Sequence, residues 1–440
     1  MRSLESLHQE YRRVTPRSLA QWERGRPVMP GGIIKGAYWS SPYPIYVDRA
    51  QDCYLWDLDG RRYVDFDNHH TAVILGHSPQ AVRDAIEREL ARGIGLGAPT
   101  TLEAEMAEEL VRRIPSVEKV RFTNSGTEAS LHATRLVRAV TGKTVVAKFE
   151  GAYHGSHDAL EISTAPALDE AGDVDSPKAV PAHRGMAKRA QDDVVVLPYG
   201  RPEAVELALR EHRDDLAAVF YDGKPGMYDM PFEFTRFVRD ITSELGILMV
   251  MDEVVSFRAG YSGYQGVCGV HPDLTVFGKI VGGGFPVGAI GGRADLMDVL
   301  DNSGVPTGLS QSGTFSGNNF TLAAGLATLR ALTPELYKHL DGLRTRLHRG
   351  LSRIFREAGQ PCHVVSQGSI VTAHLTDSPV RDYRSAMSAD RALAERIALA
   401  LLLKGYYVPT GLSFVFSAPM GTEHVDGLLE ALAEVIREDD

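Results

Sequence analysis

Cysteine is scarce in this chain. Only three of its 440 residues are cysteine, namely Cys53, Cys268 and Cys362, and they lie far apart without forming a CxxC pair. The sequence therefore offers neither a disulfide framework nor a structural zinc site, and we predict no metal centre. Scattered cysteines are typical of proteins from a reducing compartment, so we expect a cytoplasmic location.

Long apolar runs and an excess of basic residues are also missing. No stretch approaches the roughly 18 apolar residues that cross a bilayer, and the first residues are polar, without the apolar core of a secretory signal. The net charge is −10, and we find no basic stripe along the sequence. Neither a membrane nor a nucleic acid is therefore expected as a partner.

The chain is long enough for more than one core, and its 43% hydrophobic and 24% charged residues are ordinary globular usage. From about residue 78, helices alternate with short apolar strands, which predicts an α/β fold with a mostly parallel sheet between helices. The predicted helices are 78–92, 101–113, 126–141, 202–212 and 232–245. The predicted strands are 145–149, 194–197, 217–221, 247–251 and 274–277.

The two ends of the chain follow other patterns. Residues 1–25 predict one polar helix, and 45–66 predict short strands in a hairpin-like arrangement. After residue 320 the sequence predicts helices at 320–331, 335–357, 389–404 and 422–437, with short strands near 369–374 and 413–416. We therefore predict an N-terminal segment 1–75, a large domain 76–320 and a smaller α+β domain 321–440, which the N-terminal segment helps to form.

Residues 163–192 interrupt this pattern, because they contain few large apolar side chains and an acidic piece. Such a long loop inside a compact domain is usually a lid, a subunit contact or a disordered segment, and all three remain open.

The first motif with chemical meaning is Asn124-Ser125-Gly126-Thr127-Glu128, at the start of the helix predicted over 126–141. Free backbone N–H groups at a helix start bind anions, and glycine permits a close approach. The same residues form ordinary helix caps, so the motif alone leaves both interpretations open.

Two further motifs follow apolar strands. Asp252 comes after 247–251, and a carboxylate there needs a partner, which could be a cationic ring nitrogen, a metal, a helix cap or a basic side chain. Lys279 lies between the strand 274–277 and the glycines 282–284. Desolvation would lower its pKa and make it a Schiff-base nucleophile, although most lysines are solvated surface residues.

Together the three motifs supply the contacts that pyridoxal phosphate requires. The helix start would bind the phosphate, Asp252 would keep the pyridine nitrogen protonated, and Lys279 would bond to the aldehyde. The protonated ring then acts as an electron sink.

The sequence resembles the class III aminotransferases, which are fold-type I pyridoxal phosphate enzymes, over nearly its whole length. The resemblance rests on these motifs and on Leu55–Gly60, Leu75–His77, Phe149–Gly155 and Ser312–Asn318. It is strongest to the branch that holds glutamate-1-semialdehyde 2,1-aminomutase and the β-amino-acid aminotransferases. It implies a large domain with a seven-stranded type of sheet and a smaller α+β domain built from both termini.

The resemblance also implies a role for each site residue. Lys279 would form the Schiff base, Asp252 would pair with the pyridine nitrogen, and Ser125, Gly126 and Thr127 would hold the phosphate. Tyr153 and Val254 would pack on the two faces of the ring. Thr314 would reach the phosphate bound by the neighbouring subunit, which implies a homodimer with shared active sites.

The sequence departs from the family pattern at three places. Tyr221–Pro225 stands where the family usually has a Glu-Pro pair, so either Asp222 replaces the glutamate as a shorter carboxylate or the loop is rebuilt. The stretch 407–413 lacks the arginine that binds an α-carboxylate in many members, which makes a glutamate/2-oxoglutarate pair doubtful. Lys35 falls near the position of a carboxylate-binding arginine of β-amino-acid aminotransferases, so we expect it to bind one anionic group of the substrate, although a solvated loop lysine is the alternative. Competing anion binders are Arg135, Arg138 and Arg258, of which Arg258 is the best placed to face the cleft.

The expected function is amino-group transfer on a small amino acid or amine that carries an anionic group, such as a β-amino acid. The alternative is intramolecular transfer of the aminomutase type. A racemase on the same fold is a less favoured third possibility. A non-catalytic relative is also less favoured, because Lys279 and Asp252 are both present.

Overall fold

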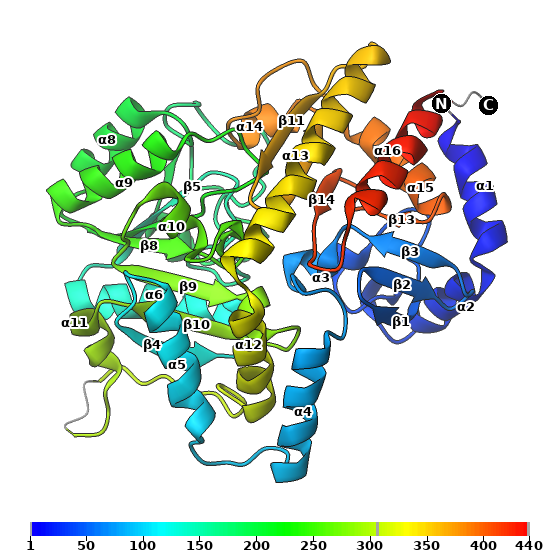
Figure 1. The fold of residues 1–440 in the computed structure, drawn as a ribbon. Coiled ribbons are helices and arrows are strands. Elements are labelled where there is room, and N and C mark those ends of the chain that lie inside the picture. The colour runs from blue at the N-terminus through cyan, green and yellow to red at the C-terminus, as the bar shows by residue number, and fades with distance from the viewer. Residues whose placement is uncertain (1, 305–307, 438–440) are drawn as a thin grey trace. The chain divides into compact units, whose positions relative to one another are not determined.

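The computed structural model of the chain describes residues 2–304 and 308–437, which divide into two compact units (Figure 1). The small unit comprises Met1–Pro79, Lys338–Pro379 and Ser388–Asp440, and the large unit comprises Gln80–Tyr337 and Val380–Met387. The boundary expected at 75/76 thus lies at 79/80. The boundary expected at 320/321 lies at 337/338, because α12 (Asn319–Ala331) packs against α4 (Gln80–Arg92) and α5 (Thr101–Arg113) of the large unit.

The large unit is built on a seven-stranded sheet with the order β4-β10-β9-β8-β7-β5-β6. Its strands are β4 (Lys119–Thr123), β5 (Val145–Phe149), β6 (Val194–Leu197), β7 (Leu216–Tyr221), β8 (Leu248–Asp252), β9 (Leu274–Gly278) and β10 (Gly288–Gly292). Neighbours from β9 to β6 are parallel, and β10 is antiparallel to both β4 and β9. The predicted α/β class with a mostly parallel sheet is confirmed.

Strand β10 escaped the sequence analysis because its residues are Gly-Ala-Ile-Gly-Gly, which lack the apolar run of a buried strand. Its glycines are needed for packing. A Cβ atom on Gly288 would lie 1.9 Å from the carbonyl oxygen of Ser125, so no larger residue fits beside the start of α6 (Gly126–Thr141).

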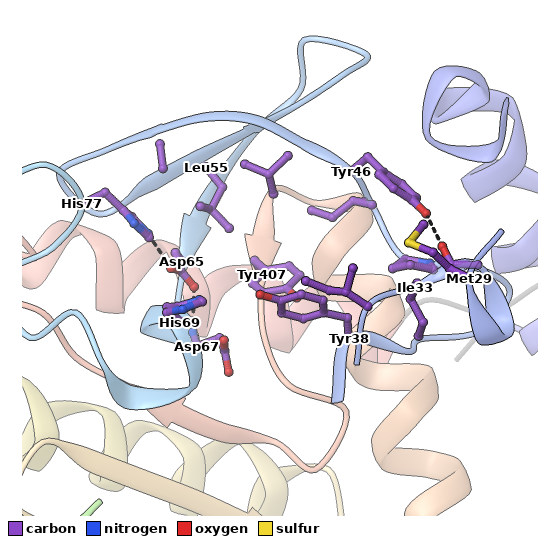
Figure 2. A pocket seen from close by; sticks show the side chains of 16 residues that line it. Met29, Ile33, Tyr38, Tyr46, Leu55, Asp65, Asp67, His69, His77 and Tyr407 are labelled. Atoms are coloured by element: carbon purple, nitrogen blue, oxygen red, sulfur yellow. Dashed lines mark hydrogen bonds and ion pairs between the residues drawn. The ribbon is translucent and has the colours of Figure 1, made fainter. Parts of the chain in front are cut away.

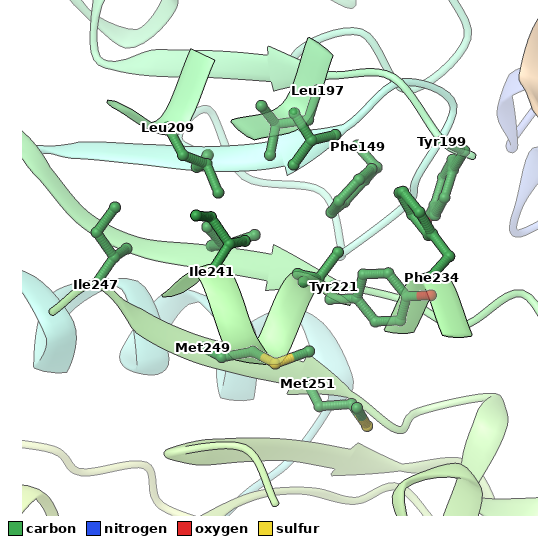
Figure 3. Close-up of a cluster of buried hydrophobic side chains, with 14 of the residues drawn as sticks. Phe149, Leu197, Tyr199, Leu209, Tyr221, Phe234, Ile241, Ile247, Met249 and Met251 are labelled. Carbon is green, nitrogen blue, oxygen red and sulfur yellow. The ribbon is translucent and has the colours of Figure 1, made fainter. Parts of the chain in front are cut away.

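Both faces of this sheet are covered by apolar packing. On one face, β-strand side chains such as Tyr221 pack with Phe234 of α9 (Phe232–Leu245) and Leu209 of α8 (Pro202–Glu211) (Figure 3). On the other face, Phe220 packs with residues of α6, including Leu136. Alternate residues of one strand thus face opposite cores, which explains its continuous apolar sequence.

The segment 163–192 is a defined loop that ends in the short helix α7 (Lys188–Asp192). The backbone N–H of Ser163 donates to the carbonyl of Val180 at 2.7 Å, and its hydroxyl donates to the carbonyl of Lys178 at 2.8 Å. Arg384, in α14 (Tyr383–Met387), forms an ion pair with Glu150 at 2.9 Å and donates to backbone carbonyls of this loop. These contacts explain why 380–387 belongs to the large unit.

The small unit contains two sheets. One has the order β1-β2-β3-β13 and the other the order β11-β12-β14. The strands are β1 (Val47–Gln51), β2 (Tyr54–Asp57), β3 (Arg62–Asp65), β11 (His363–Gln367), β12 (Ile370–His374), β13 (Tyr406–Tyr407) and β14 (Ser413–Val415). Its longer helices are α1 (Leu4–Val14), α2 (Pro16–Gly25), α13 (Pro334–Glu357), α15 (Arg391–Leu403) and α16 (Thr422–Arg437).

The single helix predicted over 1–25 is two helices. They meet at Thr15, where Pro16 occupies the first position of α2 and has no N–H to continue α1.

In the part of the chain that the structure describes, no helix combines the length and apolar character needed to cross a bilayer.

Candidate active site

Asp252 ends β8 and is 5% exposed. Its Oδ1 accepts a hydrogen bond from the backbone N–H of Val254 at 2.9 Å, and its Oδ2 lies 2.7 Å from Nδ1 of His154. The carboxylate is therefore held in one orientation by two contacts. His154 was not among the predicted site residues, although it lies in Phe149–Gly155, one of the runs on which the resemblance rests.

Lys279 directly follows β9, which is the strand beside β8. The register pairs Asp252 with Val276, so the carboxylate and the lysine emerge from neighbouring strand ends. Lys279 is half-buried and has a φ of 50°. A left-handed conformation costs energy in a residue with a side chain, and such strain is often found at functional sites.

The start of α6 provides an anion site. Ser125 is its N-cap, and the Ser125 hydroxyl oxygen accepts a hydrogen bond from the N–H of Glu128 at 3.1 Å. The N–H groups of Gly126 and Thr127, the next two residues, have no acceptor within the helix, as in every first turn. The motif is thus a helix cap and can also bind an anion, so the two interpretations do not exclude each other.

Val254 connects the anion site to the lysine. A Cβ atom on Gly126 would lie 3.0 Å from one methyl group of Val254, and a Cβ on Gly278 would lie 3.2 Å from the other. Only glycines allow both segments to approach Val254 so closely. The structure therefore brings Ser125–Thr127, Val254 and Lys279 together, as the sequence analysis expected of them.

The turn Tyr153–Gly155 lies against the same helix start. A Cβ on Gly155 would lie 2.6 Å from Cα of Thr127, and the N–H of Ser156 donates to the Thr127 hydroxyl at 3.4 Å. Tyr153 is 53% exposed, so its ring is open to stack on a flat ligand. One short segment thus supplies Tyr153 and the histidine that holds Asp252.

Thr314 is exposed, in a turn next to Asn124, whose side chain donates to the Ser316 hydroxyl at 3.2 Å. Among the described residues, no hydrogen bond joins Thr314 to the other candidate residues of its own chain. This is compatible with a role toward a second subunit.

The departure at Tyr221–Pro225 forms a buried ion pair. Asp222 and Lys224 are both buried, and Lys224 Nζ lies 3.0 Å from Asp222 Oδ2. Burial is the largest influence on Asp222 and opposes its ionisation, but the charges of Lys224 and His154 and the hydrogen bonds from Lys224 together outweigh it and lower the pKa of the carboxyl group. Because Tyr221 is paired with Met251 in the sheet, Asp222 lies beside Asp252 at the next strand end.

Lys35 belongs to the small unit. It is exposed, and its Nζ lies 4.1 Å from the centre of the Tyr38 ring. Tyr38 also lines a pocket of about 450 Å³ with apolar side chains such as Ile33 and Leu55 (Figure 2). The polar side of this pocket includes Asp65, which His77 contacts at 2.8 Å.

Arg258, the competing candidate for an anion, is only 1% exposed and lies in the large unit. Lys35 is therefore the more accessible of the two cations. It has no ion-pair partner within the described ranges.

Comparison with known proteins agrees with this geometry. Residues 36–436 match the family "Aminotransferase class-III". The chain is 38% identical over 435 residues to a glutamate-1-semialdehyde 2,1-aminomutase of Rhodopirellula baltica, covering 96% of each chain. It is also similar to the crystal structure of an omega-transaminase from Sphaerobacter thermophilus, with a TM-score of 0.92, 40% identity and 96% and 97% coverage.

A third similar protein is a β-phenylalanine aminotransferase from Variovorax paradoxus. Its TM-score is 0.86 and its identity 31%, over 98% of this chain and 96% of that one.

The large unit has the groups that pyridoxal phosphate needs. Backbone N–H groups without a helical acceptor lie at the start of α6, and the buried carboxylate of Asp252 and the side chain of Lys279 come from the ends of the adjacent strands β8 and β9. Structural relatives of this chain bind this cofactor or its amino form. The chain therefore belongs to the class III aminotransferases and is a pyridoxal-phosphate-dependent enzyme that transfers amino groups on small molecules.

Proposed function

We propose that this enzyme is an aminotransferase whose amino substrate carries one anionic group bound by Lys35, with a β-amino acid as the best candidate. The observation that carries this proposal is the exposed Lys35 ammonium on the ring of Tyr38, beside an apolar pocket. The stretch 407–413 contains no arginine that could bind an α-carboxylate. The similarity to a β-phenylalanine aminotransferase supports a β-amino acid as the substrate.

In the proposed reaction, pyridoxal phosphate supplies an electron sink that stabilises negative charge on the substrate carbon bonded to nitrogen. Ser125, Gly126 and Thr127 hold the phosphate. Asp252, oriented by His154, keeps the proton on the ring nitrogen. Lys279 would hold the cofactor covalently, and its Nζ, once free, would take up and return the proton of the substrate carbon.

The aminomutase alternative uses the same residues, and the 38% identical relatives named as glutamate-1-semialdehyde 2,1-aminomutases favour it. An incubation without any keto acid separates the two. An aminotransferase stops after one equivalent of amino donor per active site, whereas an aminomutase continues to turn over a single substrate. Many turnovers of glutamate-1-semialdehyde without a keto acid would refute our proposal in favour of the alternative.

Lys35→Ala is expected to raise KM for an anionic β-amino acid at least tenfold, because a factor of ten corresponds to only about 1.4 kcal/mol of binding free energy. The expected kcat changes little. Steady-state kinetics with an anionic and a neutral amine measure the effect, and the neutral amine is the internal control.

Lys35→Arg keeps the positive charge and should retain most of the affinity. An unchanged KM in Lys35→Ala would mean that the anionic group binds elsewhere, and the proposed role of Lys35 would then be wrong.

We propose further that the enzyme is a homodimer in which Thr314 contributes to the phosphate site of the other subunit. The exposure of Thr314 and the 66% exposure of the adjacent Phe315 support this. Sedimentation of the holoenzyme at micromolar concentration should show dimers or larger species. Thr314→Ala is expected to weaken cofactor binding several-fold, whereas a fully active monomer would contradict a shared site.

A cytoplasmic location is proposed on the basis of the cysteines, all three of which are free thiols. Reporter-tagged protein fractionated from its own host would test this location.

A further inference from the structure

Lys148, in β5, is a buried lysine that the proposed reaction does not use. Its side chain is fully buried, and no carboxylate lies within ion-pair distance of it in the ranges 2–304 and 308–437. Burying an ammonium group without a counter-ion is expensive, so its polar contacts must compensate.

In its protonated form Nζ has three N–H donors, and these contacts take one each. Nζ donates to the carbonyl oxygen of Ala152 at 2.8 Å, to the carbonyl oxygen of Ile162 and to the hydroxyl of Thr164 at 3.3 Å. One side chain thus ties together the two ends of the segment 152–162. Without it, the two buried carbonyl groups would lose these bonds, at a cost comparable to an unmade hydrogen bond each.

The segment 152–162, whose two ends Lys148 joins, contacts both Asp252 and the start of α6 in the candidate active site. Ala152 directly precedes Tyr153 and His154, and His154 contacts Asp252 at 2.7 Å. Two residues after His154, the backbone N–H of Ser156 donates a hydrogen bond to the hydroxyl of Thr127. A shift of the Ala152 carbonyl would therefore displace residues that contact Asp252, the proposed partner of the ring nitrogen, and Thr127, at the proposed phosphate site.

We propose that Lys148 is a positioning residue of the active site, which holds Tyr153–Gly155 in place through its three contacts with Ala152, Ile162 and Thr164 and so keeps His154 against Asp252. This inference rests on the proposed roles of Asp252 and Thr127, but it makes its own claim about the order of the segment 152–162 in the protein without cofactor.

The test is the variant Lys148→Met, which keeps the length and apolar character of the side chain and removes its donors. We expect the dissociation constant of pyridoxal phosphate to rise at least tenfold. We also expect amide hydrogen exchange across 152–162 to become faster in both the apoprotein and the holoenzyme. The matched control is Lys143→Met, because Lys143 lies just before the same strand and its Nζ donates to the carbonyl of Arg213 at the surface.

A lysine that served stability alone would lower the unfolding midpoint but leave cofactor affinity and local exchange of the folded protein unchanged. That result would overturn the proposal. Faster exchange in the apoprotein with unchanged cofactor affinity would show that Lys148 orders the segment 152–162 but that this order does not affect Asp252 and Thr127. The proposed role of Lys148 in the active site would then be wrong.

If Lys148→Met does not fold, Thr164→Val removes only the longest of the three contacts. It should raise the dissociation constant by a few-fold and accelerate exchange near 162–164. No change in either quantity would refute the proposal.

A pH measurement provides an independent readout. Burial lowers the pKa of Lys148 from 10.5 to about 7, the charge of Lys224 acts in the same direction, and Glu161 opposes it. His157, which also senses the charge of Lys148, has its own pKa lowered to about 4, mainly by burial, and so does not titrate in the window used here.

Between about pH 7 and 10.5 the unfolded chain therefore holds a proton on Lys148 that the folded chain lacks, and stability should rise with pH in this window. The urea midpoint of the wild type should show this rise, and Lys148→Met should lack that part of it. Equal slopes in the two proteins would mean that Lys148 is not buried as described.

Discussion

Lys279→Ala is expected to reduce turnover to background and to abolish the covalent attachment of pyridoxal phosphate. Lys279 follows β9 at the strand end beside Asp252, and Gly278 packs against Val254 next to the anion site at the start of α6. Borohydride reduction of the wild type should therefore link the cofactor to the peptide that contains Lys279. Mass spectrometry of the digested protein and the visible absorbance of the variant measure the two effects.

Among the described residues of the large unit, the lysines that are buried are Lys148 and Lys224, and they make this test specific. Lys224 is paired with Asp222, and Lys148 donates to backbone carbonyls. Labelling of either residue in place of Lys279 would show that the Schiff-base lysine has been misassigned. Lys143→Ala, at a half-buried position outside the candidate site, should label and react as the wild type does.

Asp252→Asn is expected to retain the cofactor and to lose most of the activity. A neutral amide cannot keep the ring nitrogen protonated, and truncating one side of a buried charge pair costs about 2–5 kcal/mol. If this loss falls on the transition state, kcat decreases roughly 30- to 5,000-fold. Stopped-flow measurement of the reaction of the bound cofactor with an amino donor tests the prediction.

Near-normal turnover of Asp252→Asn would contradict the role of Asp252 as the partner of the ring nitrogen. His154→Gln is a useful companion variant, because it leaves the carboxylate in place and removes the side chain 2.7 Å from it. We expect an intermediate loss of activity from it. A loss as large as that of Asp252→Asn would mean that the orientation of the carboxylate matters as much as its charge.

The positions of Asp252 and Lys279 could be predicted because both depend on local pattern. Each follows a run of apolar residues, and in a parallel sheet the ends of such runs meet at one edge. The helix start at Ser125–Thr127 is likewise visible in a few consecutive residues. These predictions needed no knowledge of which strands are neighbours.

His154 and the Asp222–Lys224 pair were not predictable in this way. His154 is 98 residues from Asp252 in sequence, and only the folded chain brings its Nδ1 to the carboxylate. Asp222 was recognised as a departure from the family pattern, but its pairing with Lys224 depends on a turn in which Lys224 has a φ of 46°.

Apolar periodicity and strand-end residues therefore determined the α/β class, most helix and strand positions and the candidates Ser125–Thr127, Asp252 and Lys279, because hydrophobic burial acts on consecutive residues. Tyr153, Val254 and Thr314 followed only from the resemblance to the family. Only the tertiary structure decided the unit boundary at 337/338, the glycine-rich strand β10 and the contacts of Lys148 and His154. The boundary, the pairing of β10 and the contact of His154 join segments far apart in sequence, for which no local pattern carries a signal, and the contacts of Lys148 depend on how the loop after β5 folds back on it.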